Sequence, residues 1–161
     1  DLLGQPKVEV ARARIVAIND TVSVTTHQQF LDPTNASDLL GNPDVVIDCL
    51  DTVPSRFALQ KVAGKMGAPM VSAAIAGLMG QMTTVLPKDP GLSLVYGKEE
   101  EAPPQGVERV LGNLAPMVMQ MASLQCMEAI KIILKRPDIL RHRLLLVDLE
   151  RYTMDTMMLS D

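Results

Sequence analysis

Residues 44–56, DVVIDCLDTVPSR, decide the predicted fold. Residues 44–49 form a short, continuous apolar run that ends in acids. Runs of this kind are typical of central parallel strands, which helices cover on both faces. The next residues, 54–66, predict a helix, and Asp51 or Thr52 would cap it. A strand that leads directly into a helix indicates an α/β fold.

The residues that follow continue this rhythm. A second strand is predicted over residues 70–74 and a third over 81–86, with Gly77 and Gly80 on either side of a turn. Strands that alternate with helices are the signature of a doubly wound α/β sheet. We therefore expect a mostly parallel sheet.

The carboxyl-terminal third predicts a different arrangement. A long helix is expected over residues 113–134, and two strand-like runs follow at 144–147 and 153–159. We interpret these two runs as a terminal antiparallel pair. The stretch 87–106 is rich in Pro and Gly and carries an acidic run, so it is either a mobile functional loop or a crossover.

The amino-terminal part predicts three short elements. Residues 6–18 read as an amphipathic helix that opens at a proline. Residues 21–26 alternate in the manner of a strand and are rich in β-branched side chains. A short helix over 37–40 then ends at Gly41. The chain has no initiator Met and opens almost directly into a helix, so we expect it to be a piece of a longer protein.

Composition narrows the possible functions. The chain has 161 residues, 47% of them apolar, and a net charge of −4. These values fit a compact domain and argue against nucleic acid as the main partner. Cys49 and Cys126 lie far apart without a partner motif, so we expect neither a disulfide nor a zinc site. The expected compartment is the reducing cytoplasm. Polar residues interrupt the apolar window 110–134, which favours a buried helix over a membrane span.

Five blocks of sequence together form a recognisable pattern. They lie in one order and spacing over nearly the whole chain, and they are GQPKVE at 4–9, DCLDTVPSR at 48–56, AGLMGQ at 76–81, LQCMEAIK at 124–131 and LVD at 146–148. The pattern resembles ThiF, MoeB and HesA proteins, which are adenylating proteins related to ubiquitin-activating enzymes. The resemblance covers the carboxyl-terminal part of that family only.

This resemblance implies a fold and a domain organisation. The fold is a Rossmann-like, doubly wound and incomplete sheet, and residues 1–161 form a single domain that lacks its amino-terminal nucleotide-binding half. Residues 87–109 are the family's crossover loop. Adenylating members of the family use ATP and Mg²⁺ to activate the carboxyl-terminal glycine of a small ubiquitin-like sulfur carrier with a β-grasp fold.

The resemblance also assigns roles to four residues. Lys7 stands where the family places a lysine on the ATP phosphates, and a positive charge at the start of a helix suits that task. Asp51 stands where the family holds Mg²⁺ and nucleotide, and one carboxylate with phosphate oxygens is sufficient for Mg²⁺. Arg56 keeps the family arginine and would brace Asp51 or a phosphate, or form only a surface salt bridge. Thr52 replaces the usual asparagine and loses its amide donors, which puts ordinary nucleotide contact there in doubt.

Two interpretations of function remain open. The parent protein is an ATP-dependent adenylating enzyme, or the domain is a non-catalytic binding or dimerisation module. A dinucleotide-binding oxidoreductase is a weaker alternative, because no G-x-G-x-x-G motif is present. Thioester or persulfide chemistry is not expected, since the cysteines lie outside the stretch 87–106. A homodimer is expected from the Met-rich helix that starts near Asn113 and from family habit.

Overall fold

A computed structural model describes residues 2–32, 34–103 and 106–160. The chain divides into two compact units, Asp1–Leu31 and Asp32–Asp161. We describe each unit by itself.

The first unit contains one helix, α1 (Lys7–Ile18), which confirms the helix predicted over residues 6–18. All of α1 is described, and none of its residues is buried. The predicted strand over residues 21–26 is wrong, because this segment is an extended loop without a paired strand. Its local bonds are those of a turn: the Asn19 side chain accepts from both the amide and the hydroxyl of Thr21. β-Branched residues favour strands only where a neighbouring strand packs against them.

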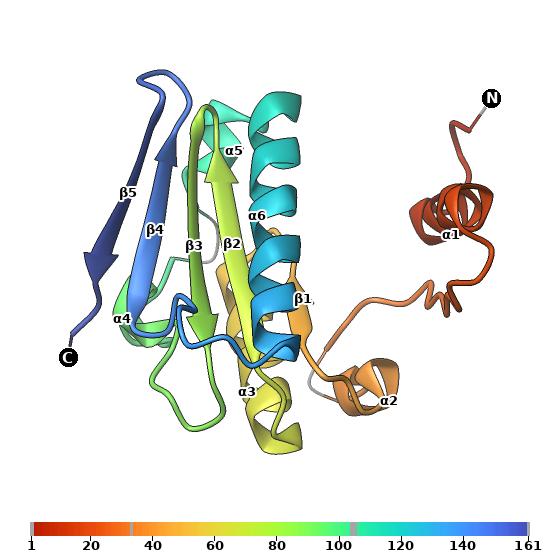
Figure 1. Cartoon of the computed structure of the whole chain (residues 1–161), viewed down its shortest axis with the longest axis horizontal. Coiled ribbons are helices and arrows are strands. Elements are labelled where there is room, and N and C mark those ends of the chain that lie inside the picture. The colour runs from red at the N-terminus through yellow and green to blue at the C-terminus, as the bar shows by residue number, and fades with distance from the viewer. Residues whose placement is uncertain (1, 33, 104–105, 161) are drawn as a thin grey trace. The chain divides into compact units, whose positions relative to one another are not determined.

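The second unit is built on one sheet of five strands in the order β1-β2-β3-β4-β5 (Figure 1). The strands are β1 (Val46–Asp48), β2 (Met70–Ala76), β3 (Met79–Val85), β4 (Arg143–Asp148) and β5 (Thr153–Met158). The α/β class and the terminal antiparallel pair are confirmed. The mostly parallel sheet needs correction for the described strands, since β1–β2 is parallel and the other pairs are antiparallel. For β2 and β3 the reason is the tight turn at Gly77 and Leu78, because a two-residue connection joins only antiparallel strands.

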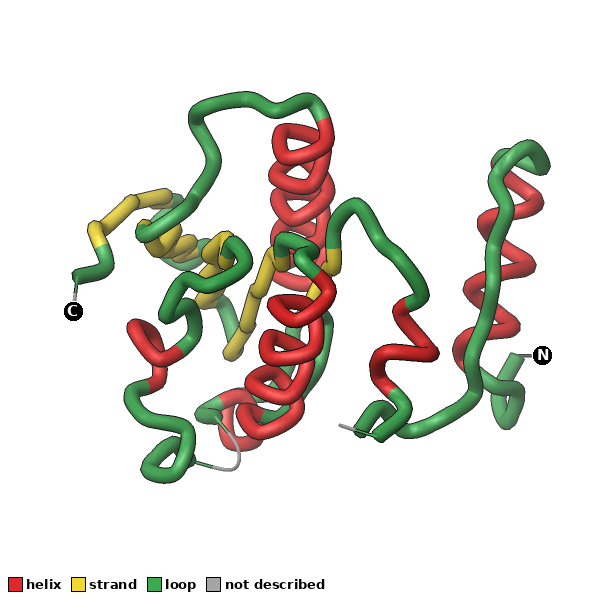
Figure 2. Tube along the Cα trace, turned by 90° about the horizontal axis from the view of Figure 1, so that it is seen from below, coloured by secondary structure: helices red, strands yellow, loops and turns green. Residues whose placement is uncertain are grey.

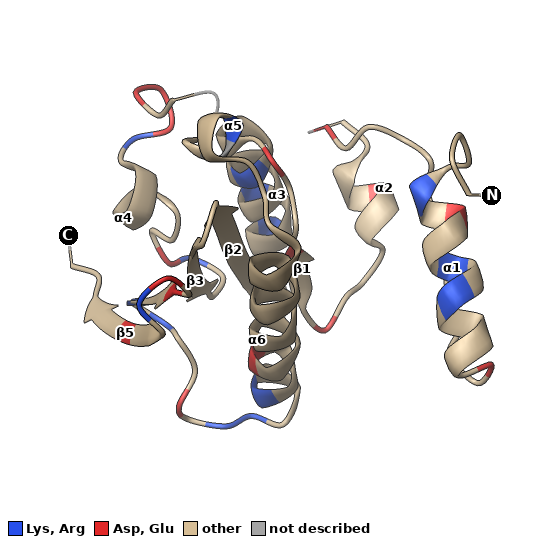
Figure 3. Ribbon diagram, turned by 90° about the horizontal axis from the view of Figure 1, so that it is seen from above, with Lys and Arg blue, Asp and Glu red and all other residues tan. Residues whose placement is uncertain are grey.

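Helices cover both faces of this sheet. The described helices are α2 (Ala36–Leu40), α3 (Val53–Met66), α4 (Ser93–Tyr96), α5 (Glu108–Leu111) and α6 (Ala115–Ile133). Figures 2 and 3 show α3 and α6 on opposite sides of the strands. The helices predicted over 37–40, 54–66 and 113–134 are confirmed, whereas the stretch 87–106 contains the unpredicted α4.

The face toward α6 holds a core that depends on methionine. Met82 of β3 packs there with Met117 and Met121 of α6, against Val71 of β2 and Val147 of β4. The chain has two Phe and two Tyr, so long, flexible Met side chains fill the space between helix and sheet. Figure 3 shows the charges of α6 only near its carboxyl-terminal end. In the part of the chain that the structure covers, no helix is long and apolar enough to cross a membrane.

Gly80 allows this close packing. A Cβ built on Gly80 would lie 2.6 Å from Sδ of Met121 and 2.8 Å from Sδ of Met117. At Gly80, the absence of a side chain leaves room for the thioethers of Met117 and Met121.

We predict that Gly80→Ala destabilises the protein by about 1–3 kcal/mol, because the added methyl group overpacks the Met core. Gly64 in α3 is the control, since a Cβ there meets nothing within 4 Å. Gly64→Ala should leave stability unchanged or raise it by up to about 1 kcal/mol, as Ala favours a helix. Urea unfolding followed by circular dichroism measures both. Equal effects of the two substitutions would contradict the packing argument.

Candidate functional site

A pocket of about 510 Å³ lies at the carboxyl ends of β1 and β2. Because these two strands are parallel, their carboxyl ends meet at one edge of the sheet, where open α/β sheets bind ligands. The walls come from β1, β2, β3, α3, α6 and the segment around Tyr96 and Val107. Most of the lining is apolar, and its charged residues are Asp48, Asp51 and Arg56. Asp51 and Arg56, the two predicted site residues of this segment that carry a charge, therefore line the same pocket.

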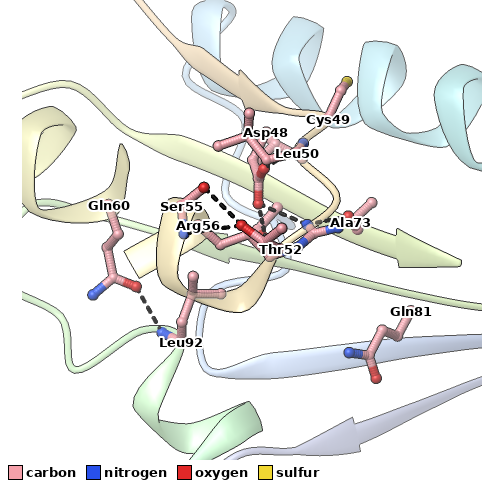
Figure 4. Close-up of polar contacts among 12 residues, drawn as sticks. Asp48, Cys49, Leu50, Thr52, Ser55, Arg56, Gln60, Ala73, Gln81 and Leu92 are labelled. Atoms are coloured by element: carbon pink, nitrogen blue, oxygen red, sulfur yellow. Dashed lines mark hydrogen bonds and ion pairs between the residues drawn. The ribbon is translucent and has the colours of Figure 1, made fainter. Parts of the chain in front are cut away.

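Asp48 is the polar centre of the pocket floor. It is fully buried, and its Oδ2 accepts from Nη1 of Arg56 at 2.8 Å and from the hydroxyl of Ser72 at 2.6 Å. Its Oδ1 accepts from the backbone amide of Leu50 at 2.9 Å. Figure 4 shows the Asp48 carboxylate and the Arg56 guanidinium pointing toward each other, with the Ala73 carbonyl as a second acceptor for Arg56.

Arg56 is thus bound to Asp48, and no described hydrogen bond or ion pair joins it to Asp51. The expected surface salt bridge is wrong, because Arg56 is 7% exposed. A strand side chain alternates between the two faces of the sheet, and Asp48 faces the side that α3 covers. Asp51 lies in the turn beyond the strand and is exposed. The prediction that Arg56 acts on a phosphate remains a prediction.

Gln125 holds the same strand ends from the other face. Its Nε2 donates to the Asp48 carbonyl at 2.9 Å and to the Val71 carbonyl at 3.2 Å. Gln125 belongs to α6 and is 5% exposed. Gln125 belongs to the sequence block at 124–131, and only its place in the fold marks it as a residue of the pocket floor. A buried amide that donates to two strands ties α6 to the pocket floor.

Thr52 is the N-cap of α3, which confirms one of the two predicted capping residues. Its hydroxyl donates to Oγ of Ser55 at 2.7 Å and accepts from the Ser55 amide at 3.4 Å. The hydroxyl is therefore engaged within the helix start. The predicted contact between Thr52 and nucleotide stays a prediction.

The segment that carries α4 is fixed to α3 and β3. Oε1 of Gln60 accepts from the Leu92 amide at 2.7 Å (Figure 4). Tyr96 packs edge-on against Phe57, with ring centroids 6.4 Å apart, and its hydroxyl meets Nε2 of Gln81 at 3.1 Å. Tyr96 and Gln81 both line the pocket, so this segment forms one of its walls.

Cys49 lies at the pocket and is exposed. Partial burial of the thiol raises the pKa of Cys49, and the Asp48 carboxylate raises it further. Cys126 lies in α6 and is also exposed.

Two further predictions concern Lys7 and the Mg²⁺ ion. Lys7 is the first residue of α1 and belongs to the first unit, so its predicted contact with phosphates is not tested. Within residues 2–32, 34–103 and 106–160, no three His, Cys, Asp or Glu side chains form a group that could hold a metal ion. A Mg²⁺ ion at Asp51 would have to take its other ligands from water and substrate phosphates, which is common for this ion.

The fold and the pocket define an α/β protein with a pocket beyond the carboxyl end of β1. A family model described as the ThiF family matches residues 1–161. The chain therefore belongs to the ThiF family, as the sequence blocks predicted.

Its relatives include named activating enzymes. The SAMP-activating enzyme E1 of Haloferax volcanii is 33% identical over 159 residues, which cover 97% of this chain and 58% of that enzyme. The molybdopterin-synthase adenylyltransferase of Escherichia coli is 32% identical over 136 residues, which cover 81% and 53%. The chain thus spans about half the length of the curated relatives it matches.

Solved structures match the fold. PaaA has a TM-score of 0.74 at 17% identity, with 98% of this chain and 56% of that chain covered. E. coli MccB, crystallised with ATP, has a TM-score of 0.72 at 16% identity, with 98% and 48% covered. These likenesses show the fold alone.

We predict that Arg56→Met destabilises the protein by about 3–5 kcal/mol, because it leaves the Asp48 carboxylate buried without its cation. The double variant Asp48→Asn, Arg56→Met should recover part of this loss. Lys98→Met is the control, since its exposed pair with Glu101 should contribute at most about 1 kcal/mol. Urea unfolding measures all three. A loss below about 1 kcal/mol for Arg56→Met would contradict a buried ion pair.

The raised pKa of Cys49 predicts a pH dependence. Only the thiolate reacts with maleimides, so labelling of Cys49 in a Cys126→Ser background should reach its midpoint above the pH of an ordinary thiol. Asp48→Asn should lower that midpoint, because it removes a negative charge that opposes ionisation. Asp44→Asn, at the other end of β1, should not move it. Identical midpoints for all variants would contradict the assigned cause.

Proposed function

We propose that this chain forms the magnesium-binding side of an ATP-dependent adenylating enzyme, which activates the carboxyl-terminal glycine of a small ubiquitin-like sulfur carrier. The observation that carries the proposal is the exposed acid Asp51 in a pocket at the carboxyl ends of two parallel strands. The names of the relatives support it, since they include adenylyltransferases for molybdopterin synthase and for the sulfur carrier ThiS.

The reaction joins the carrier to AMP. A carboxylate oxygen of the terminal glycine forms a bond to the α-phosphorus of ATP, and the bond from that phosphorus to the pyrophosphate oxygen breaks. Asp51 would hold Mg²⁺, which neutralises charge on the phosphate oxygens. Lys7 would add positive charge at the phosphates, and the amino end of α1 would assist it.

The partners follow from the same proposal. The carrier would be a β-grasp protein, and the reaction would take place in the cytoplasm. The chain would form a homodimer through the apolar outer surface of α6. That surface carries several exposed large side chains, which are Met119, Met127, Ile130 and Ile133. Exposed apolar patches of this kind mark interaction sites.

A second candidate is a non-catalytic binding or dimerisation module of the ThiF type. The engaged hydroxyl of Thr52 favours it, because the family's asparagine is replaced by a side chain whose described bonds lie within the helix start. The exposed surface of α6 fits this candidate equally well. It predicts a dimer that binds a β-grasp protein without ATP, and sedimentation velocity with and without the carrier measures both properties.

We predict that the complete gene product catalyses ATP–pyrophosphate exchange that depends on a β-grasp carrier ending in glycine. Asp51→Ala should lower the exchange rate by at least about 100-fold, since it removes the ligand for the charge-neutralising ion. The matched control is Asp44→Ala, an exposed acid before the same strand, which should retain the wild-type rate. Exchange that is absent with every carrier tested, or unaffected by Asp51→Ala, would rule out this role.

A further inference from the structure

We propose that Asp48 is a positioning residue, whose buried carboxylate fixes the turn from Cys49 to Thr52 and so places Asp51 in the pocket. Arg56 and Gln125 serve the same purpose through Asp48. This role of Asp48 deepens the proposed function. Its test by pyrophosphate exchange rests on the proposed function, whereas its test by hydrogen exchange at Leu50 does not.

The bonds of Asp48 set the course of the turn. Oδ1 accepts from the Leu50 amide at 2.9 Å, which bends the backbone immediately after β1. The turn then ends at Thr52, which is fixed as the cap of α3 by Ser55. Asp51 is the next residue after Leu50 and lies between these two anchors. Its carboxylate is therefore placed by its neighbours rather than by a described bond of its own.

Two elements fix the carboxylate of Asp48, and a third holds its backbone carbonyl. Arg56 reaches the carboxylate from α3 and Ser72 from β2, and both bind Oδ2. Ser72 lies directly opposite Asp48 in the parallel ladder. Gln125 holds the Asp48 carbonyl from α6 at 2.9 Å. A buried side chain with its oxygens satisfied in this way has little freedom to move.

These contacts point to positioning rather than to contact with substrate. Asp48 is fully buried, and both of its oxygens already accept hydrogen bonds. Nη1 of Arg56 binds Asp48 and the Ala73 carbonyl together, which keeps the guanidinium against the sheet. Groups behind a metal ligand orient it, and their loss weakens metal affinity by about 10–100-fold.

The other end of the sheet supplies a matched control. Asp148 ends β4 and accepts from the Glu150 amide at 2.9 Å, as Asp48 accepts from the amide two residues further on. Its Oδ2 also binds an arginine, Arg151, at 3.0 Å. The turn after Asp148 contributes no residue to the pocket. Asp148→Asn therefore disturbs a turn of the same kind as the one after Asp48, but this turn does not contain Asp51.

The experiment compares Asp48→Asn with Asp148→Asn in the complete gene product. Asp48→Asn removes the negative charge beside Arg56, and its one amide oxygen cannot accept at both positions where the Asp48 carboxylate accepts. We expect hydrogen exchange of the Leu50 amide to accelerate by at least about tenfold, while amides of β3 keep their protection. The Mg²⁺ concentration for half-maximal pyrophosphate exchange should rise by about 10-fold or more, with the KM for the carrier unchanged. Asp148→Asn should accelerate exchange of the Glu150 and Arg151 amides, which both donate to Oδ1 of Asp148, and leave Leu50 unchanged.

A conservative variant separates positioning from folding. Arg56→Lys keeps a cation that can reach Asp48, so it should restore most of the Leu50 protection and Mg²⁺ response that Arg56→Met loses. If Asp48→Asn fails to fold, the comparison of Arg56→Lys with Arg56→Met decides. Wild-type Leu50 exchange and Mg²⁺ response in a folded Asp48→Asn protein would overturn the proposal. Failure of the wild type to exchange pyrophosphate would remove the proposed function, and the Leu50 measurement would still decide whether Asp48 fixes the turn.

Discussion

Burying a carboxylate and a guanidinium costs free energy unless each group finds several partners. In the second unit, Asp48 and Arg56 are buried together and each has a further partner. Their 2.8 Å contact joins β1 to α3, and Ser72 adds β2 at the same oxygen. Among the described residues, no buried side-chain nitrogen or oxygen lacks a hydrogen-bond partner. The ion pair therefore connects the start of α3, the end of β1 and the middle of β2 at the floor of the pocket.

The opposite face of the sheet is held in a different way. There, Gly80 lets α6 approach β3, and the thioethers of Met117 and Met121 fill the space that a side chain would take. Gln125 joins this apolar layer to the polar floor, since it lies on α6 and binds the backbone of both β1 and β2. One helix thus contributes to core packing near Gly80 and to the pocket near Asp48.

The sequence predicted the elements better than their partners. The strand at 46–48 and the helix after it were predictable because an apolar run and a capped, proline-opened helix are local signals. The strand expected over 21–26 failed because a strand needs a neighbour, which no local pattern reports. The direction of β3 could have been inferred, as the two residues between Ala76 and Met79 leave no room for a crossover. The partner of Arg56 could not be predicted, since both Asp48 and Asp51 precede it on the segment that leads from β1 into α3, and only the pleat of β1 selects Asp48.

The charge of the pocket limits what this chain can do alone. Its charged lining consists of Asp48, Asp51 and Arg56, two acids and one base, which gives a net charge of −1. Arg56 is paired with Asp48, so the exposed charge is that of Asp51. A polyphosphate would be repelled from such a surface unless a cation lay between them. In the proposed function, the Mg²⁺ ion that Asp51 would hold would be that cation.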